Sequence, residues 1–462
     1  MAKALVLGAG IVGITMAYEL WRDGHEVTVV DRETGAAEFT SFGNAGMIAP
    51  GHAYAWASPA SPGILLKSLW RNDQALRLKP SMDPAFVKWM WKFWGQCSAQ
   101  RAATNTKRKV RLCNYAQQVF HETRAETGVS YDANDGGILY LFRSQSAFEA
   151  ANKKAEILRR EGSDIGVLDA DGIAGKDPAL ADSKEQFAGA LFGCRDETGD
   201  CRMFTRNLAS WLEERGVVFR WGVTVEALET NGDRVSGIVT DQENLSADIV
   251  VLSLGVYSPH LAKPVGIDLP IYPVKGYSMT VPVSGRNNAP AIGGIDEESL
   301  VAYTPMGNRL RVTATAEFSG YRVNHSPDDF RHMTSVVKGL FPDGADYSRA
   351  EYWAGLRPMK PEGTPILGAT KFKNLWMNTG QGHMGWTMSH GAGRLVADLI
   401  AGPTPAIPLD GRMLEGLLQF MTMSPTDPVK LVDHLESDQF HGFDCFNQKP
   451  CWHRYRTRKP VR

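Results

Sequence analysis

Three glycines near the start of the chain have the spacing of a phosphate-binding loop. Gly8, Gly10 and Gly13 match the pattern G-x-G-x-x-G and directly follow an apolar run at 3–7. The first glycine permits a tight turn, the second lets the backbone approach a pyrophosphate, and the third lets the following helix pack closely. Asp31 lies about twenty residues further on, where a carboxylate hydrogen-bonds a ribose 2′-hydroxyl and repels a 2′-phosphate. The pattern predicts binding of FAD or NAD in preference to NADP.

A second set of glycines, Gly380, Gly382 and Gly385, repeats this spacing. It also stands between a predicted strand, at 374–378, and a predicted helix. Proline and loop residues from Gly402 onward replace the second strand and acid of a complete unit. This second set therefore needs a different explanation from the first.

The elements that must position the first glycines form a β-α-β unit. Residues 3–7 predict a strand, and apolar residues then recur at helical spacing as far as Trp21. Gly24 ends this helix, and the run at 27–30 predicts a second strand that leads into Asp31. The complete context makes this glycine motif specific.

Two domains that alternate along the chain are the simplest account of the remaining pattern. Short strands with turn residues between 264 and 348 predict an antiparallel sheet that binds the substrate. We therefore expect an α/β fold in which a Rossmann-type domain is interleaved with an α+β domain. The predicted ranges are 1–84, 165–263 and 349–402 for the Rossmann-type domain, 85–164 and 264–348 for the substrate domain, and 403–462 for a C-terminal extension.

Composition restricts the class of protein. The 462 residues are 43% hydrophobic and 22% charged, with a net charge of -1, which argues against nucleic acid as the main partner. No apolar stretch approaches the ~20 residues of a membrane span, and the chain enters its first strand too early for a signal peptide, so we expect a cytoplasmic location. The cysteines, including Cys445 and Cys451 near two histidines, fit no usual zinc pattern, so no metal is expected.

The extension at 403–462 ends in a run of basic residues with no acid after Asp444. Such a segment is typically a surface extension or a partly disordered tail. The alternative is a contact with anionic lipid or with a partner protein.

Several short motifs together resemble one known family. The chain is similar to the D-amino-acid oxidase superfamily of FAD-dependent oxidoreductases, and within it to the bacterial D-amino-acid dehydrogenases. The motifs that carry the resemblance are TSFGNAG at 40–46, DETGDC at 196–201, YPVKGYS at 272–278, GLRP at 355–358, and NTG at 378–380 with GWTM at 385–388. They occur in the family's order between residues 1 and 402.

The resemblance implies oxidative deamination of D-amino acids to 2-oxo acids and ammonia, with hydride transfer from Cα to the N5 atom of FAD. Arg357 is then the candidate for the substrate carboxylate, because a guanidinium matches a carboxylate in a bidentate fork. Its alternative role is a salt bridge between domains. Tyr277 and Tyr54 are candidates for the pocket wall, and His52 and His383 for groups near the reacting atoms.

FAD is expected to bind non-covalently along an extended site. The second glycine loop then has an explanation, because the positive end of its helix favours the negative charge of a reduced flavin. The residues expected to contact FAD are Gly8, Gly10, Ile11, Val12, Gly13, Asp31, Arg32, Ser41, Asn44, Ala45, Gly46, Met47, Val225, Gly255, Gly380, Gly382, His383, Met384, Gly385 and Thr387.

One loop departs from the family pattern. After Gly380 the family usually has histidine, glycine, threonine and leucine, whereas this chain has glutamine, glycine, His383 and Met384. The resemblance also implies that electrons pass to a quinone or another acceptor that is not oxygen. The tryptophan-rich run at 89–94 fits either a helix that faces the core, which the spacing favours, or a peripheral contact with the cell membrane.

Other functions are consistent with the same motifs. They are a sarcosine- or glycine-type amine oxidase, a D-proline-type dehydrogenase, an NAD-dependent dehydrogenase, and a non-catalytic flavoprotein subunit.

Overall fold

The computed structural model describes residues 1–68, 76–79, 81–285, 288–402 and 404–411. All of them belong to one compact unit. Most of the expected C-terminal extension, with Cys445 and Cys451, lies outside the described residues. In the part of the chain that is described, no helix is long and apolar enough to cross a membrane, and no group of three or more histidine, cysteine or acidic side chains is placed to hold a metal ion.

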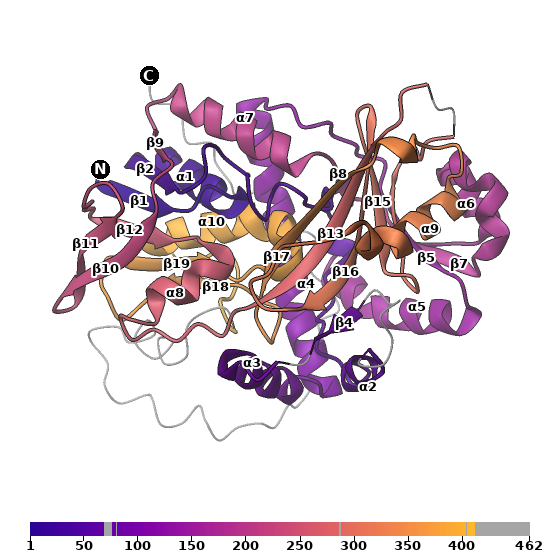
Figure 1. The fold of residues 1–462 in the computed structure, drawn as a ribbon, viewed down its shortest axis with the longest axis horizontal. Helices are drawn as coiled ribbons and strands as arrows, with labels where there is room; N and C mark the ends of the chain where they lie inside the picture. Colours follow the sequence, from indigo (N-terminus) through magenta and orange to yellow (C-terminus); the bar gives the residue numbers. More distant parts are fainter. Residues whose placement is uncertain (69–75, 80, 286–287, 403, 412–462) are drawn as a thin grey trace, which may run out of the picture. The chain divides into compact units, whose positions relative to one another are not determined.

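A six-stranded sheet contains the predicted β-α-β unit (Figure 1). Its strands, in spatial order, are β18 (Ile366–Ala369), β19 (Leu375–Thr379), β12 (Ile249–Leu252), β1 (Lys3–Leu7), β2 (Glu26–Asp31) and β9 (Val218–Trp221). Neighbouring strands are parallel except for β18 and β19. Strand β1 therefore lies inside the sheet. One neighbour, β2, follows it by about twenty residues, and the other, β12, comes from the second half of the sequence.

Both faces of this sheet are covered, which explains its continuous apolar strands. Ala4 and Val6 of β1 belong to a core cluster with residues of α1 (Ile11–Arg22) and α10 (Gly385–Ala401). Leu5 and Leu7 point to the other face and join a cluster formed with α8 and the β10–β11 hairpin. The bounds of these elements are Ser258–Ala262 for α8, Val225–Asn231 for β10 and Arg234–Thr240 for β11.

Helix α4 (Ala99–Thr127) packs on α10, which in turn packs on α1. A Cβ added at Gly391 of α10 would meet the Cα of Ala116 at 2.8 Å, and one at Gly393 would meet the carbonyl oxygen of Thr15 at 3.2 Å. The two glycines let α10 approach α4 on one side and α1 on the other.

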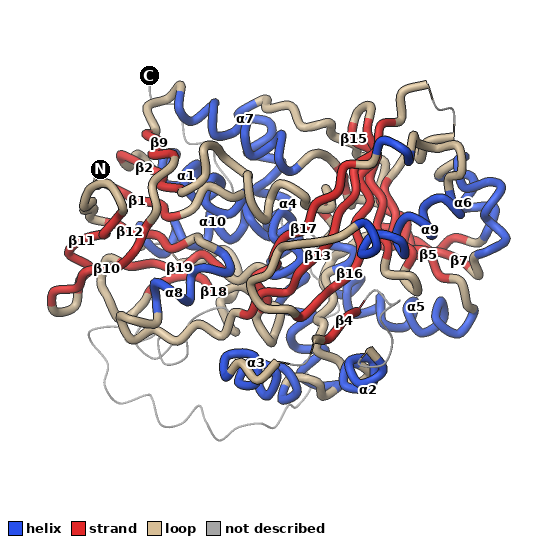
Figure 2. The backbone as a smooth tube through the Cα atoms, viewed as in Figure 1, coloured by secondary structure: helices blue, strands red, loops and turns tan. Residues whose placement is uncertain are grey.

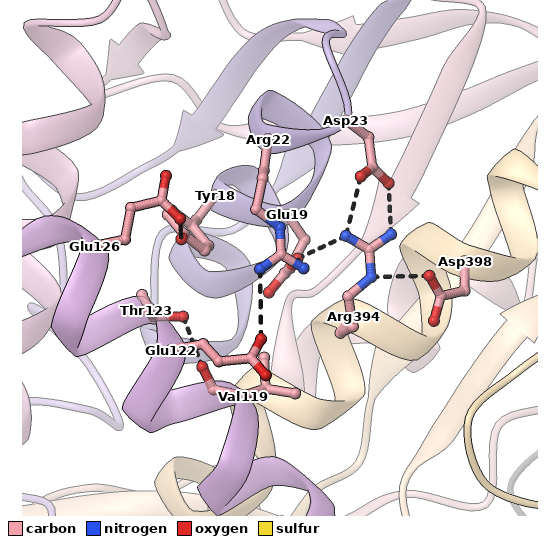
Figure 3. A network of polar contacts seen from close by, with 10 residues as sticks. All are labelled: Tyr18, Glu19, Arg22, Asp23, Val119, Glu122, Thr123, Glu126, Arg394 and Asp398. Atoms are coloured by element: carbon pink, nitrogen blue, oxygen red, sulfur yellow. Dashed lines mark hydrogen bonds and ion pairs between the residues drawn. The ribbon is translucent and has the colours of Figure 1, made fainter. Parts of the chain in front are cut away.

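Ion pairs reinforce this contact (Figure 3). Arg394 of α10 pairs with Glu19 at 2.8 Å and with Asp23 at 2.5 Å, both at the α1 side, and with Asp398 at 2.9 Å. The Glu19 side chain is fully buried, and it also pairs with Arg22 at 2.7 Å. Burial raises the pKa of Glu19 to about 7, although the two arginines act to lower it.

The second sheet is mixed and mostly antiparallel (Figure 2). Eight of its strands follow the order β17 (Glu351–Met359), β13 (Tyr272–Pro282), β16 (Arg309–Phe318), β15 (Val301–Met306), β14 (Gly293–Asp296), β5 (Ile138–Phe142), β7 (Gly189–Gly193) and β6 (Ile165–Leu168). The ninth strand, β4 (Leu76–Leu78), pairs with β16. The pairs β14–β5 and β16–β4 are parallel. The expected α/β fold with a separate, largely antiparallel sheet is therefore confirmed.

Helices cover both faces of the second sheet. On one face α9 (Arg331–Leu340) and α6 (Ala170–Lys176) contribute side chains to one apolar cluster. The same cluster contains residues of β13, β15 and β16. On the other face β5 and β7 contribute side chains to the cluster that contains α4 and α5 (Gln145–Arg160). The same cluster contains β1 and α1, so the two sheets share a continuous core.

The expected domain boundaries need a correction. The ranges 165–263 and 349–402 were expected in the Rossmann-type domain, but β6, β7 and β17 belong to the mixed sheet. The reason is their pairing, because β7 pairs with β5 and β17 pairs along its whole length with β13. The chain thus passes into the mixed sheet twice within the ranges expected in the Rossmann-type domain, once at β6 and β7 and once at β17.

Two helices follow α2 (Ser61–Lys67) along the chain, namely α3 (Pro84–Gly95) and α4, and Ser98 is the N-cap of α4. Helix α3 lies near α2, below the mixed sheet in Figure 1. Trp89 and Phe93 are buried against β13 and β16, as a helix facing the core requires. Trp91 and Trp94, however, are 70% and 50% exposed, so α3 is apolar on both faces.

Candidate active site

A cavity of about 750 Å³ is lined by residues from both sheets. On the parallel sheet its walls come from the ends of β1, β2 and β12, where the strands give way to loops. This is the position at which open α/β sheets bind their ligands. On the mixed sheet the walls come from β13, β16 and β17.

The first glycine loop has the geometry that its motif predicts. Gly8 has φ +106°, and a Cβ there would lie 2.7 Å from the carbonyl oxygen of Ser253. A Cβ at Gly13 would lie 1.7 Å from the carbonyl oxygen of Gly8, so no other residue fits. Gly10 is the N-cap of α1 and lines the cavity, as do Ile11 and Val12 in the first turn. The positive end of α1 therefore faces the cavity, as pyrophosphate binding requires.

Asp31 stands at the end of β2 and lines the same cavity. Its Oδ2 accepts a hydrogen bond from the N–H of Ala9 at 2.6 Å, and its Oδ1 accepts one from Glu33 at 2.9 Å. Burial raises the pKa of Asp31, against the effect of these two donors. A carboxylate has about four lone-pair sites, so Asp31 holds the glycine loop and still has acceptors for a ribose hydroxyl.

The loop at 40–47 is attached to helix α1 and to the mixed sheet. Ser41 Oγ accepts from the N–H of Ile11 at 3.1 Å, and the Asn44 side chain accepts from Gly46 at 2.8 Å. Arg311 of β16 donates to the backbone oxygen of Asn44 at 3.0 Å. Gly46 has φ +75°, and a Cβ there would lie 2.4 Å from a backbone oxygen. The predicted residues of this loop that line the cavity are Ser41, Asn44, Ala45 and Met47.

The end of the cavity near Asp31 is lined by Arg32, Val225 and Gly255, as predicted for FAD contacts. The Arg32 guanidinium lies 4.3 Å from the centre of the Tyr257 ring. This end therefore combines apolar and aromatic groups with acids that include Asp31, which suits an adenosine.

The second glycine loop connects β19 to α10 at another part of the cavity. Gly380 and Gly382 have φ +80° and +65°, which side chains rarely adopt. Gly380 makes the turn and does not line the cavity, whereas the residues after it do so, namely Gly382, His383, Met384, Gly385 and Thr387. The N-terminus of the 17-residue helix α10 thus faces the cavity, and its dipole favours negative charge there.

Arg357 of β17 brings a positive charge to the part of the cavity near the second glycine loop. Its Nη1 donates to the carbonyl oxygen of Thr315 at 3.0 Å, and its guanidinium lies so close to Gly276 that a Cβ there would be 2.5 Å from Nη2. Among the described residues, no carboxylate forms an ion pair with Arg357. Burial lowers the pKa of Arg357 to about 10, and no acid offsets this effect. A guanidinium enclosed in this way is a receptor for a ligand carboxylate.

Tyr54 and His52 both line the cavity. The Tyr54 hydroxyl is buried and has no hydrogen-bond partner in the described part of the chain, while the ammonium group of Lys154 lies 4.2 Å from the centre of the Tyr54 ring. His52 Nε2 lies 2.8 Å from Glu297, and its ring stacks on Tyr140 with 5.2 Å between centres. The Tyr54 hydroxyl is therefore available to a ligand, whereas the His52 ring is already held on two sides.

His383 is held between an aromatic ring and a lysine. Its ring stacks on Trp56 with 4.8 Å between centres, and its Nε2 lies 3.3 Å from the Nζ of Lys109. Lys109 also donates to the backbone oxygen of Tyr54 at 2.8 Å. Burial lowers the pKa of Lys109 to about 7, and burial together with nearby cations lowers the pKa of His383 well below its usual value.

Tyr277 contributes to the cavity wall through its ring alone. Its ring lines the cavity, but its hydroxyl donates to Glu317 at 2.8 Å and is not free for a substrate. Glu317 is buried and also pairs with Lys79 at 2.9 Å and Lys275 at 3.7 Å. The sequence motif that contains Tyr277 does not show that a buried acid binds its hydroxyl.

Three residues of this site escaped the sequence analysis. Lys109, Trp56 and Thr315 surround His383 and Arg357, but none belongs to a recognised motif. The sequence gives one signal for Lys109. It lies four and seven residues before Cys113 and Ala116, on the same face of the helix, and these two residues are buried.

The residues present fit FAD. One end of the cavity has a strand, a glycine loop, a helix N-terminus and an acid that can accept from a ribose hydroxyl, and another region has a second helix N-terminus and Arg357. The cavity is long enough to be lined by groups from both glycine loops, which a mononucleotide would not need.

Comparisons with known proteins agree with this geometry. The family of FAD-dependent oxidoreductases matches residues 3–399. The chain is 43% identical to D-amino acid dehydrogenase 2 of Mesorhizobium japonicum over 90% of its own length and all of the relative's. It is 45% identical to D-amino acid dehydrogenase of Rhizobium johnstonii over 88% of its length and 97% of the relative's.

A solved structure with the same fold is glycine oxidase from Geobacillus kaustophilus, with a TM-score of 0.67 and 20% identity over 90% of this chain and 99% of that one. L-Proline dehydrogenase from P. horikoshii has a TM-score of 0.66 at 17% identity over 87% of this chain and 94% of that one. These likenesses concern the fold, whereas the family match and the curated relatives extend to sequence over most of the chain. The chain therefore belongs to the family of FAD-dependent oxidoreductases.

Proposed function

We propose that the protein is an FAD-dependent D-amino-acid dehydrogenase, which oxidises D-amino acids to imino acids that water then converts to 2-oxo acids and ammonia. Two relatives at 43% and 45% identity carry this name, and both align over nearly their whole length. The same relatives support the D configuration of the substrate.

One observation carries the proposal, namely the guanidinium of Arg357. It is enclosed at the cavity, it is oriented by the Thr315 carbonyl oxygen at 3.0 Å, and it has no carboxylate partner among the described residues. An uncompensated charge in such a place is costly, and a substrate carboxylate compensates it. A bidentate fork also fixes the orientation of the Cα that follows the carboxylate.

The neighbouring side chains complete a site for an amino acid. FAD, when bound, supplies the acceptor for the Cα hydrogen, which leaves as hydride. The Tyr54 hydroxyl has no hydrogen-bond partner among the described residues and can hydrogen-bond the substrate. Trp56 and Met384 line the same cavity and exclude water from it.

The experiment is a substrate panel on the purified holoenzyme. Flavin reduction is measured without oxygen, and turnover is measured with either a quinone dye or oxygen as acceptor. We expect D-alanine to reduce the flavin and the dye to accept the electrons. Reduction by sarcosine or glycine but not by D-alanine would assign an amine oxidase, and a preference for D-proline would assign a D-proline dehydrogenase.

The panel also tests the other classes of function. Colourless protein that binds NAD would contradict the FAD assignment. Flavoprotein that no amino acid reduces, and whose properties do not change in Arg357→Met, would indicate a non-catalytic subunit.

We further propose that the electrons pass to a membrane quinone and that the enzyme acts at the cytoplasmic face of the cell membrane. Exposed Trp91 and Trp94, with Lys88 and Lys92 on the same helix, fit the headgroup region of an anionic bilayer. Phe93, on the opposite face of α3, lines the cavity. The helix therefore connects an apolar surface with the wall of the site.

This second proposal is tested with lipid vesicles. The holoenzyme should sediment with vesicles that contain anionic lipid, and the double substitution Trp91→Ser and Trp94→Ser should weaken this binding. Val218→Ser, which removes an exposed apolar side chain from the other sheet, is the control. Equal sedimentation of all three proteins would contradict the proposed surface.

A further inference from the structure

Lys109 is a fully buried lysine on α4. Its Nζ has two neighbours, the carbonyl oxygen of Tyr54 at 2.8 Å and Nε2 of His383 at 3.3 Å. Among the described residues it has no ion pair with an acid. A buried lysine without an acid is stable only if it readily loses its proton.

His383 connects this lysine to the cavity. Its ring is partly accessible and lines the cavity, whereas Lys109 is completely enclosed behind it. The stacked Trp56 ring holds the imidazole in place. A proton that reaches Lys109 from the cavity by this route must therefore pass through the imidazole.

The hydrogen bonds of the pair can be satisfied in two protonation states. Neutral Lys109 donates to the Tyr54 carbonyl oxygen and accepts from an Nε2–H of His383. Charged Lys109 donates to both groups, and the His383 proton is then on Nδ1. The two states differ by one proton on Lys109 and by a change of tautomer of His383.

Burial is the main reason why Lys109 favours its neutral state. Cys113 of α4 acts in the other direction, and Lys154 of α5 acts, less strongly than Cys113, against the charge of Lys109. His52 and Arg357 act against a charge on His383. Glu297 faces His52 and Lys154, not Lys109.

We propose that Lys109 and His383 form a proton relay that accepts the proton lost by the substrate ammonium group. The inference rests on the proposed function, because an amino acid enters the site as an ammonium ion and its nitrogen lone pair must be free before hydride can leave Cα. The N–H bond of the ammonium breaks and its proton joins Nδ1 of His383. The Nε2–H bond breaks in turn, and that proton joins Nζ of Lys109. The substrate becomes a neutral amine, His383 stays neutral, and Lys109 becomes an ammonium ion.

The first test is the pH dependence of flavin reduction by D-alanine in the holoenzyme. In the wild type we expect the second-order rate constant to rise with pH to a plateau, with a midpoint near 7, the pKa of Lys109. Lys109→Met cannot accept the proton, so only substrate that is already deprotonated reacts. The midpoint then moves up towards the pKa of the free amino acid, and the rate at neutral pH falls about 100-fold, as for the loss of a general base.

Two further variants make this test specific. His383→Asn interrupts the relay from the cavity side and should move the midpoint in the same direction. Lys107→Met removes a lysine from the exposed face of the same helix and should leave the profile unchanged. An unchanged midpoint in both Lys109→Met and His383→Asn, with normal reduction in the wild type, would overturn the relay.

The second test does not depend on turnover. The pKa of Lys109 is about 7 in the folded protein, and that of an unfolded lysine is about 10.4. Between these values the unfolded chain binds one more proton, so the stability of the wild type rises with pH by this contribution. Lys109→Met lacks it, and the difference in unfolding free energy between the two proteins should change in favour of the wild type from about pH 7 to about pH 10. A difference independent of pH would overturn the proposal.

The two tests separate the relay from the proposed function. If no D-amino acid reduces the wild-type flavin while the stability difference varies with pH, the proposed function is wrong and the substrate of the relay is misassigned with it. If D-amino acids reduce the flavin with the same pH midpoint in all variants, only the relay is wrong.

Discussion

Arg357 and Thr315 show how a side chain is prepared for its ligand. Thr315 has φ +65°, a conformation that is uncommon for a β-branched residue and costs of order 1–3 kcal/mol. In this conformation its carbonyl oxygen accepts from Nη1 of Arg357 at 3.0 Å. Local strain in β16 therefore accompanies a fixed orientation of the guanidinium before a carboxylate binds.

Replacement of Arg357 by lysine tests this preparation. Lysine keeps the charge but not the two parallel N–H donors, so we expect kcat/KM for D-alanine to fall about 100-fold, which corresponds to the loss of one charged hydrogen bond. Most of the loss should be in the binding of substrate, measured as the dissociation constant in stopped-flow reduction. Arg331→Lys, at an exposed pair with Asp328, is the matched control. Equal dissociation constants for Arg357→Lys and the wild type would contradict this role.

Sequence patterns predict single residues well where the chemistry needs a particular residue type at a fixed spacing. Gly8, Gly13 and Asp31 were identified in this way, because turn geometry and ribose binding leave few alternatives. Lys109 could not be identified, because a lysine in a helix is normally exposed and only its neighbours in space make it reactive. The contact of the Tyr277 hydroxyl could not be predicted for the same reason, since its partner Glu317 is forty residues away.

At the scale of elements, α10 has two functions that depend on its length. Its N-terminus faces the cavity, where its dipole acts, and its middle packs between α1 and α4. Gly391 makes the second contact possible, because α4 approaches its Cα within van der Waals distance. The position of the N-terminus at the site thus depends on small residues in the next turns of the same helix.

The substitution Gly391→Ala should therefore destabilise the protein. The new Cβ would lie 2.8 Å from the Cα and Cβ of Ala116, so α4 and α10 must move apart. We expect a loss of about 1–3 kcal/mol in urea unfolding, as for other overpacked sites.

Gly339→Ala in α9 is the control for this substitution, because a Cβ there meets nothing within 4 Å. It should leave stability unchanged or raise it by up to about 1 kcal/mol, because alanine favours the helix. A neutral Gly391→Ala would show that the helices have room to adjust.

Most helices and strands are predictable from periodicity, but their partners are not. The runs that form β6 and β7 read as strands or short apolar segments of either sheet, since pairing with β5 is decided by contacts across the fold. The region at 83–128 reads as one helical pattern because both α3 and α4 are amphipathic, and the break at Ser98 is a local cap. The apolar residues on both faces of α3 also prevent periodicity from showing which face is buried.

At the scale of the whole molecule, charges connect helices that are far apart in sequence. Arg394 joins α10 to Glu19 and Asp23 at the α1 side, and Tyr18 donates to Glu126 of α4 at 2.7 Å (Figure 3). Glu19 is the buried member of this group. It is tolerated inside the protein because two arginines share its charge.

Removal of one arginine tests whether the buried charge of Glu19 needs both partners. Arg394→Met leaves Glu19 with Arg22 alone, and we expect a loss of about 3 kcal/mol in unfolding free energy. The double variant with Glu19→Gln should recover part of the loss, because the buried charge is then gone. Arg331→Met removes an exposed pair and should cost less than about 1 kcal/mol. A loss for Arg394→Met no larger than for Arg331→Met would show that the pair contributes little.

The interleaving of the two sheets was predictable, but the return of β6, β7 and β17 to the mixed sheet was not. Hydrophobic patterns show that a segment is buried and do not show which sheet it joins. The division expected at 165 and 349 placed these strands by their neighbours along the chain, whereas pairing partners determine their place.

The central position of β1 has a consequence for synthesis. Its partner β12 lies about 245 residues after β1, and α10 lies about 375 residues after α1, so both are synthesised much later than the β1-α1-β2 unit. Until then the apolar faces of β1 and α1 lack the cover that these partners provide. The β1-α1-β2 motif is encoded locally, but its packing is completed only when most of the chain has been synthesised, so contacts of high sequence separation limit the folding of this domain.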